Sequence, residues 1–184
     1  MSGHTAFIGL GSNLGDPHTQ LETALQALHE LPKSRLAATS PIYQSRPVGP
    51  PQPDYLNAVA RLETSLTPLT LLDQMQAIEA AQGRQRKERW GPRTLDLDVL
   101  LYDNQKFSSP RLTLPHPELA QRPFVLYPLA DIAPDLILPG GGRLQELLRA
   151  CPYEGLQRLA DTWRRHAGPL QARTQTQSNG HKET

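Results

Sequence analysis

The chain has 184 residues, a formal net charge of +1, 18 prolines and a single cysteine. This length suits one loop-rich domain that buries about 70% of its unfolded surface. A nearly neutral chain has no global field that recruits nucleic acid, and the lone Cys151 excludes an intramolecular disulfide. Because no apolar run is long enough to cross a membrane or to direct secretion, we expect a cytoplasmic protein.

The first element is a short apolar run over residues 5–10, followed by a cluster of turn residues. The spacing of Gly9, Gly11 and Gly15 is one residue too wide for a dinucleotide-binding fingerprint, and no Gly-Lys-Ser/Thr follows to make a phosphate-binding loop. We therefore predict a strand and then an amphipathic helix, with Asp16 as its N-cap and leucines at three- and four-residue intervals.

The middle of the chain predicts two more strands and a second helix. Residues 35–43 predict a strand that Pro41 weakens, and a stiff loop rich in proline and glycine follows at 45–53. Residues 55–64 alternate between apolar and polar side chains, which is typical of a strand with one buried face. The segment 68–83 opens with proline and closes with glycine, as helices commonly do.

The stretch from Arg84 to Tyr102 joins a basic loop to a strand with two acids. On that strand Asp96 and Asp98 project from one face, with Cα atoms roughly 6.6 Å apart. The apolar residues of the strand point the other way into a core: Leu95, Leu97, Val99 and Leu101. Taken separately, alternating aspartates and a basic run are typical of solvated surface. Their adjacency favours a site.

Two carboxylates this close resist joint ionisation, so the pair suits a bound cation. Hard oxygen ligands without nearby Cys or His favour magnesium over zinc. Arginines and a carboxylate-held Mg²⁺ are the usual means of neutralising a polyphosphate, and we therefore predict a nucleoside triphosphate site.

The element order strand, helix, strand, strand, helix, strand predicts an α+β fold of the ferredoxin-like βαββαβ type. In this arrangement a four-stranded antiparallel sheet carries both helices on one face and leaves the opposite face open. Tyr55, Asn57, Asp96 and Asp98 are each out of phase with the apolar residues of their strands. We expect all of them on the open face.

Beyond the acidic strand the chain adds a C-terminal region. It contains an apolar run at 125–129, a glycine turn at 140–142 and a short helix over 144–150. Cys151 has no activating neighbour in sequence, so we expect a small buried residue there. One domain should cover 1–164, and the polar segment 165–184 lacks apolar periodicity and should be disordered.

His116 stands between two prolines in a stiff loop. A lone histidine is more often structural or solvated than catalytic. Its place between Arg111 and Arg122, in one excursion after the acidic strand, favours phosphate or base contacts for all three residues.

Several motifs together resemble the 6-hydroxymethyl-7,8-dihydropterin pyrophosphokinase family of folate biosynthesis. They are Tyr55-Leu56-Asn57, Arg89-Trp90-Gly91-Pro92-Arg93-Thr94-Leu95-Asp96-Leu97-Asp98 and Pro115-His116-Pro117. The resemblance implies transfer of the pyrophosphoryl unit of ATP to the hydroxymethyl oxygen of the pterin, with release of AMP. We expect a monomer whose partners are small molecules, without nucleic acid or membrane.

The resemblance also implies roles for individual residues. Asp96 and Asp98 match the ligands of two Mg²⁺ ions that bridge the triphosphate, and both count as catalytic together with Arg84 and Arg93. The pterin site is matched by Ser45, Val48, Tyr55, Asn57 and Phe124. The ATP site is matched by Gln76, Glu79, Arg86, Trp90, Arg93, Arg111, Thr113, His116 and Arg122. The basic loop matches a mobile segment that closes over ATP.

Two other classes of protein fit parts of the pattern. Asp-x-Asp on a strand also serves nucleotide-sugar glycosyltransferases, which usually need a larger nucleotide-binding domain than 184 residues allow. The second is a non-enzymatic ferredoxin-like module that binds RNA or a small regulator on its open sheet face. Such a module needs exposed aromatics and a basic sheet face, whereas this face carries acids.

Overall fold

The computed structural model describes residues 3–83, 94–159 and 163. In chain order the elements are β1 (His4–Ser12), α1 (Pro17–His29), β2 (Ser34–Thr39), β3 (Tyr43–Ser45), β4 (Tyr55–Thr64), α2 (Pro68–Ala81), β5 (Asp96–Tyr102), β6 (Phe107–Ser108), β7 (Thr113–Leu114), the 3₁₀ turn η1 (Leu119–Gln121), α3 (Pro123–Ile132), α4 (Leu144–Ala150) and β8 (Leu156–Arg158).

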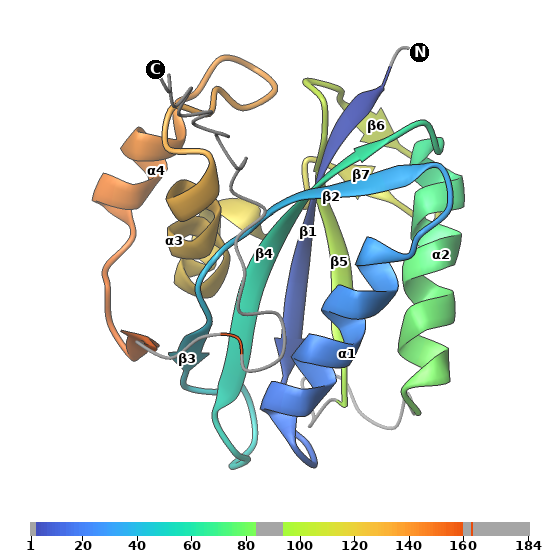
Figure 1. The fold of residues 1–184 in the computed structure, drawn as a ribbon. Helices are drawn as coiled ribbons and strands as arrows, with labels where there is room; N and C mark the ends of the chain where they lie inside the picture. The colour runs from blue at the N-terminus through green and yellow to red at the C-terminus, as the bar shows by residue number, and fades with distance from the viewer. Residues whose placement is uncertain (1–2, 84–93, 160–162, 164–184) are drawn as a thin grey trace, which may run out of the picture.

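Within the described ranges the main sheet has six strands. Five of them are neighbours in the order β5-β1-β4-β3-β8, and β2 pairs with residues 60–64 of β4, further along that strand than β3 (Figure 1). All of its pairings are antiparallel. The prediction of an α+β fold with an antiparallel sheet is confirmed. The predicted number of strands, four, was wrong, because one predicted strand is divided and β8 joins the sheet from the C-terminal region.

The divided strand breaks at Pro41, which has no N–H for the ladder. Ser40 keeps the chain hydrogen-bonded to β4 beside the break. Its backbone N–H donates to the Val59 carbonyl at 2.9 Å, and its hydroxyl oxygen accepts from the Val59 N–H at 2.9 Å. The Ser40 carbonyl in turn accepts from the indole N–H of Trp163 at 3.1 Å. Ser40 is therefore hydrogen-bonded both to β4 and to Trp163 of the C-terminal segment.

Helices cover both faces of the sheet, α1 and α2 on one and α3 and α4 on the other (Figure 1). The face under α1 and α2 carries the larger core, which includes Ile8, Leu62 and Leu97. The opposite face was predicted to be open. It instead holds a second apolar cluster, in which Val59 packs with Leu126 and Leu129 of α3. Only part of that face remains uncovered.

A bulge in β5 explains a second difference from the predicted pattern. Ile8 pairs with Val99 but the preceding residue, Phe7, pairs with Leu101, which leaves Leu100 as an extra residue. The alternation shifts by one at that point. Leu101 was predicted to face the main core but packs in the cluster beneath α3. Tyr102 occupies the position in the main core instead.

The helix starts follow the predicted chemistry. The Asp16 carboxylate accepts from the Thr19 N–H at 3.3 Å, and the Thr67 hydroxyl oxygen accepts from the Thr70 N–H at the same distance. Each cap is followed by a proline in the first turn. After α2, Gly83 adopts a left-handed conformation with φ of 80°, as expected where a helix ends.

Across the described part of the chain, no helix combines the length and the apolar character needed to cross a bilayer. The predicted tail over 165–184 and the basic loop over 84–93 lie outside the described residues.

Candidate active site

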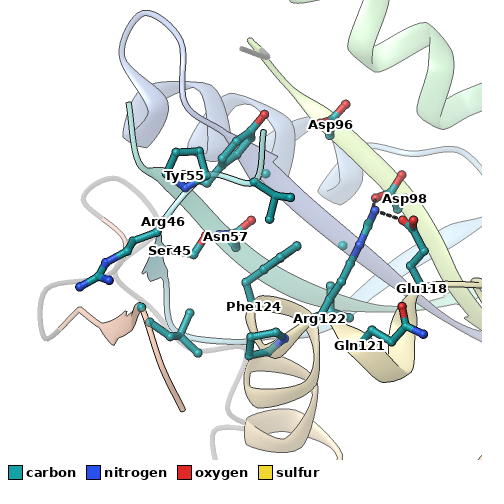
Figure 2. A pocket seen from close by; sticks show the side chains of 18 of the residues that line it. Ser45, Arg46, Tyr55, Asn57, Asp96, Asp98, Glu118, Gln121, Arg122 and Phe124 are labelled. Atoms are coloured by element: carbon teal, nitrogen blue, oxygen red, sulfur yellow. Dashed lines mark hydrogen bonds and ion pairs between the residues drawn. The ribbon is translucent and has the colours of Figure 1, made fainter. Parts of the chain in front are cut away.

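A cavity of about 800 Å³ opens on the sheet face that α3 only partly covers (Figure 2). Strands β1, β4 and β5 supply its floor through Gly11, Asn57 and Asp98, while the loop after β3 and the start of α3 supply walls. The residues that line it come from separate segments between Gly9 and Leu156. The topology of the sheet therefore gathers the site from segments far apart in sequence.

The floor at β1 consists of backbone. Gly9 and Gly11 project toward the cavity, with Asp98 and Asp96 as their partners on β5. Asn57 pairs with Gly11 from the other side, on β4. A Cβ on Gly11 would lie 3.2 Å from the Asn57 Oδ1 atom, closer than side-chain carbons normally approach. Because Gly11 has no side chain, the Asn57 amide can lie directly against β1.

One half of the cavity combines aromatic rings with an oriented amide. Asn57 is almost fully buried, and its Nδ2 group donates to the Ser45 hydroxyl oxygen at 2.6 Å. Figure 2 shows Asn57 between the side chains of Tyr55 and Phe124. Because the Nδ2 bond fixes the orientation of the amide, its oxygen faces the floor at Gly11. Such a half suits a flat heterocycle with a polar edge.

The other half carries charge. Asp96 and Asp98 project from β5 into the same cavity, and the Asp98 side chain is 43% exposed. The Arg122 Nη1 atom lies 3.7 Å from Asp98 Oδ2, and its Nη2 atom donates to Glu118. The Arg122 Cζ atom also lies 5.7 Å from the centre of the Phe124 ring. Arg122 therefore stands at the boundary between the two halves.

His116 joins the charged half in its neutral form. Burial lowers the pKa of His116, and Arg122 adds to this effect while Asp98 and Glu118 oppose it. Its Nδ1 atom accepts from the Glu118 backbone N–H at 3.2 Å, which also favours the neutral ring. With Nδ1 as an acceptor, Nε2 carries the proton. His116 can then donate a hydrogen bond from Nε2.

Ser12, the last residue of β1, and Asn13, which follows it, hold the starts of β5 and β4 in place. The buried Ser12 hydroxyl donates to the Thr94 carbonyl at 2.5 Å, just before β5 begins. The Asn13 Nδ2 group donates to the Pro53 carbonyl at 2.8 Å and to Gln52 Oε1 at 2.9 Å, just before β4. The Gly-Ser-Asn motif thus fixes the strand ends that carry Asp96 and Tyr55.

The described part of the chain contains no group of three or more His, Cys, Asp or Glu side chains placed to hold a metal ion. Asp96 and Asp98 nevertheless fit a hard divalent cation that keeps oxygen ligands from elsewhere. Mg²⁺ is commonly bound by one or two carboxylates together with substrate phosphates, and the cavity beside this pair has room for them.

All of the sequence-predicted pterin and metal residues line this cavity. They are Ser45, Val48, Tyr55, Asn57, Asp96, Asp98 and Phe124, joined by His116 and Arg122 from the predicted ATP set. Other predicted ATP residues lie at α2 and the β6–β7 hairpin, where Arg111 contacts Gln76 at 3.2 Å and Asp73 at 2.5 Å. Glu79 is buried in α2, and Thr113 is exposed on β7. Arg84, Arg86, Trp90 and Arg93 lie outside the described residues.

Sequence reasoning missed three contributions to the cavity: the glycine floor, Glu118, and a wall formed by Cys151–Leu156. In the wall, Gly155 has a φ of 65°, and its carbonyl accepts from the Arg46 N–H at 3.0 Å. The glycine floor could have been found from the sequence, because Gly9 and Gly11 are two residues apart and so face the same side of their strand, as Asp96 and Asp98 do on theirs. Cys151 is buried as predicted, and burial raises the pKa of its thiol.

Carboxylates and an arginine beside an aromatic–amide pocket are residue types that phosphoryl-transferring enzymes use. The family model for 7,8-dihydro-6-hydroxymethylpterin-pyrophosphokinase (HPPK) matches residues 7–134. The chain belongs to this family of pyrophosphokinases, which act in folate biosynthesis.

Relatives of the same family are similar over most of the chain. A 2-amino-4-hydroxy-6-hydroxymethyldihydropteridine pyrophosphokinase of Pseudomonas aeruginosa is 57% identical over 154 residues, which are 83% of this chain and 95% of the relative. The enzyme of that name from Haemophilus influenzae is 53% identical over 79% of this chain and 91% of its own length.

The fold also matches a solved structure of HPPK-DHPS in complex with substrates, with a TM-score of 0.69. The match covers 86% of this chain at 13% identity, so it concerns the fold alone. The chain spans less than half of that longer protein, 47% of its length.

Proposed function

We propose that the chain transfers the pyrophosphoryl group of ATP to the hydroxymethyl oxygen of 6-hydroxymethyl-7,8-dihydropterin and releases AMP. Membership of the pyrophosphokinase family supports this activity. The observation that carries the site assignment is the shared cavity, in which Asn57 and Phe124 face Asp96 and Asp98 across Arg122 (Figure 2).

The pterin lies in the aromatic half. Its bicyclic ring stacks between Tyr55 and Phe124, and its alternating donors and acceptors pair with the Asn57 amide. The bond from Asn57 to Ser45 holds that amide in one orientation, so the pterin meets a preorganised partner. Val48, which is 64% exposed at the rim, adds backbone groups from the loop after β3.

The triphosphate lies in the charged half. Asp96 and Asp98 would hold two Mg²⁺ ions together with phosphate oxygens, and the ions neutralise charge on the polyphosphate when they are bound. Arg122 and the Nε2–H of His116 donate to phosphate oxygens from the opposite wall. The reaction joins the pterin oxygen to the β-phosphorus and breaks the bond from that phosphorus to the oxygen that AMP retains.

Positioning does most of the catalytic work in this proposal. Phosphoryl-type transfer needs alignment and charge neutralisation more than a covalent nucleophile. The cavity places the pterin half and the phosphate half on one rigid sheet, so the two substrates meet at Arg122. The ATP contacts of Gln76, Glu79, Arg111 and Thr113 remain predictions. So do the roles of Arg84, Arg86, Trp90 and Arg93, and a monomeric state.

The core that supports the site is, we propose, a ferredoxin-like βαββαβ unit. It consists of β1, α1, the strand made by β2 and β3, β4, α2 and β5, in the antiparallel order described above. Helices α3 and α4 and strand β8 are additions that build the second layer and the far wall of the cavity.

The activity is tested by incubating the protein with ATP, Mg²⁺ and 6-hydroxymethyl-7,8-dihydropterin. We expect AMP and the pterin pyrophosphate to form in equal amounts. ³¹P NMR and chromatography would measure both products. Formation of ADP, or nucleotide turnover that does not depend on the pterin, would contradict the proposal.

A further inference from the structure

Arg122 is the residue immediately before α3, and its guanidinium lies between two carboxylates (Figure 2). Asp98 approaches from β5 on one side and Glu118 from the preceding turn on the other. The Arg122 side chain is 21% exposed, against 43% for Asp98 and 40% for Glu118. The cation is therefore more enclosed than either of its partners.

The two contacts of Arg122 differ in kind. The Nη1 atom is 3.7 Å from Asp98 Oδ2, which is beyond hydrogen-bond distance. The Nη2 atom donates a hydrogen bond to Glu118 Oε2. A charge-assisted hydrogen bond is stronger than a looser ion pair at a solvated surface, so Glu118 is the firmer anchor. The Phe124 ring supports the guanidinium from a third side.

Glu118 is itself fixed by the turn that carries it. Its backbone N–H donates to His116 Nδ1 at 3.2 Å, and the Leu119 N–H donates to the His116 carbonyl at 3.1 Å. The His116 N–H donates in turn to the Leu100 carbonyl of β5 at 2.9 Å. The turn that carries the Glu118 carboxylate is thus hydrogen-bonded to β5, the strand that also carries Asp98.

A divalent cation bound at Asp98 would weaken the contact of Arg122 with Asp98 but not its contact with Glu118. Asp98 then has a stronger partner than Arg122, and the ion repels the guanidinium. Glu118 stands on the turn before α3 and not on β5, and its carboxylate already accepts a hydrogen bond from Arg122 Nη2, so in this proposal it stays with Arg122. Without Glu118, Arg122 would have Asp98 as its remaining anionic partner among the contacts described here and would compete with the cation for it.

We infer that Glu118 is a positioning residue, which keeps Arg122 over Phe124 while Asp98 exchanges Arg122 for metal-bound triphosphate. The inference rests on the proposed function, because it assumes that the polyphosphate binds beside Asp98. It assigns to Glu118 a role in nucleotide binding that acts through Arg122 and not through direct contact with the metal.

A double-mutant cycle tests this assignment. Calorimetry would measure binding of a nonhydrolysable Mg²⁺–ATP analogue to the wild-type chain, Glu118→Ala, Arg122→Ala and the double variant. We expect Glu118→Ala to weaken binding roughly tenfold in the wild-type background and less than about twofold in the Arg122→Ala background, because coupled residues are not additive. Equal losses in both backgrounds would overturn the inference and make Glu118 a direct ligand or a bare charge.

A conservative variant separates positioning from charge. Glu118→Gln keeps a hydrogen-bond acceptor for Arg122 but removes the negative charge, so we expect its affinity to lie between those of the wild type and Glu118→Ala. Identical affinities for the Gln and Ala variants would contradict a hydrogen-bonded anchor.

A matched control comes from Arg35 and Glu63, whose side chains form a comparable pair at 2.6 Å on the exposed surface. Glu63→Ala should bind the analogue like the wild type. If the wild-type chain itself fails to bind the analogue, the proposed function falls and the inference falls with it. If the wild type binds and the cycle is additive, only the role of Glu118 is wrong.

Discussion

The two faces of the sheet are built from the same strands but do different work. Toward α1 and α2, residues such as Ile8, Leu62 and Leu97 form a closed apolar core. Toward α3, the neighbouring residues of β1 and β5 are Gly9 and Asp98, and they line a cavity. Successive side chains on a strand point to opposite faces, so a single step along β5 changes a core residue into a site residue.

This difference shows how a small domain can hold charge rigidly. Asp96 and Asp98 flank Leu97, which is only 3% exposed and packs in the main core. The carboxylates cannot move far without disturbing that packing, because protein interiors are close-packed. Core packing on one face, together with the pairing of β5 with β1, therefore holds the strand on which the carboxylates of the other face stand.

The largest expected effect separates function from fold on β5. Asp98→Asn should lower kcat about 10³-fold, as removal of charge stabilisation in a transferase site does, while leaving the melting temperature within a few degrees of wild type. Steady-state assays of AMP release and thermal unfolding would measure both. Near-normal turnover would remove Asp98 from the site.

The neighbouring position should give the reverse result. Leu97→Ala should lower the free energy of unfolding by about 2–5 kcal/mol, because it opens a cavity in the main core. Urea denaturation would measure this change, and kcat per folded molecule should stay within about threefold of wild type at low temperature. A stable but inactive Leu97→Ala variant would break the division between the two faces.

Within the cavity, Phe124→Ala should affect the pterin half far more than the charged half, because Glu118 still holds Arg122. Loss of the ring should weaken pterin binding by roughly tenfold to 100-fold, comparable to the about 1–3 kcal/mol of other base–aromatic stacks. Calorimetry with a pterin analogue and with an ATP analogue would compare the two halves. A loss confined to the nucleotide would place the pterin elsewhere.

A smaller effect is expected from the floor. Gly11→Ala places a Cβ 3.2 Å from Asn57 Oδ1, so the amide has to shift by a few tenths of an ångström. We expect pterin affinity to fall severalfold, on the order of 1 kcal/mol for a disturbed hydrogen bond. Gly9→Ala is the comparison, because its Cβ would meet the Leu100 side chain at an ordinary 3.4 Å. Equal effects of both variants on pterin affinity would argue against a specific role for the Gly11–Asn57 contact.

The smallest effect concerns pH. Burial lowers the pKa of His116, so the unfolded chain takes up a proton first as the pH falls. Stability should be unaffected by this group above the unfolded pKa of about 6.5 and should decline as the pH falls toward the folded value. His116→Gln should remove this part of the decline in urea denaturation. An NMR titration midpoint at or above about 6.5 would contradict the assignment.

Much of the first face could be predicted from the sequence because its signals are local. Caps at Asp16 and Thr67 and the alternation of residues 55–64 define the helices and strands without tertiary information. Strand phase alone placed Asn57 and Asp98 on one face, and the structure confirms that both line one cavity. The place of His116 between Arg111 and Arg122 favoured phosphate or base contacts, whereas the role of Phe124 came from family resemblance.

The second face was harder because its contacts are long-range. Val59 and Phe7 are apolar residues on the phase predicted to be open, and only α3, more than 60 residues beyond Val59, explains them. The bulge at Leu100 also reversed the expected direction of Leu101. Glu118 and the wall at Cys151–Leu156 have no periodic signal, because they lie in turns that gain meaning only from the strands beside them.

The glycine floor has a consequence for how the cavity can vary during evolution. At Gly9 and Gly11 the surface offered to a ligand is main chain, and no substitution can take main-chain atoms away. Mutation at either position can only add atoms, which makes the cavity shallower for the natural substrate and for a competing inhibitor alike. A compound that draws its affinity from this floor would therefore be hard to escape by substitution there without loss of catalytic fitness.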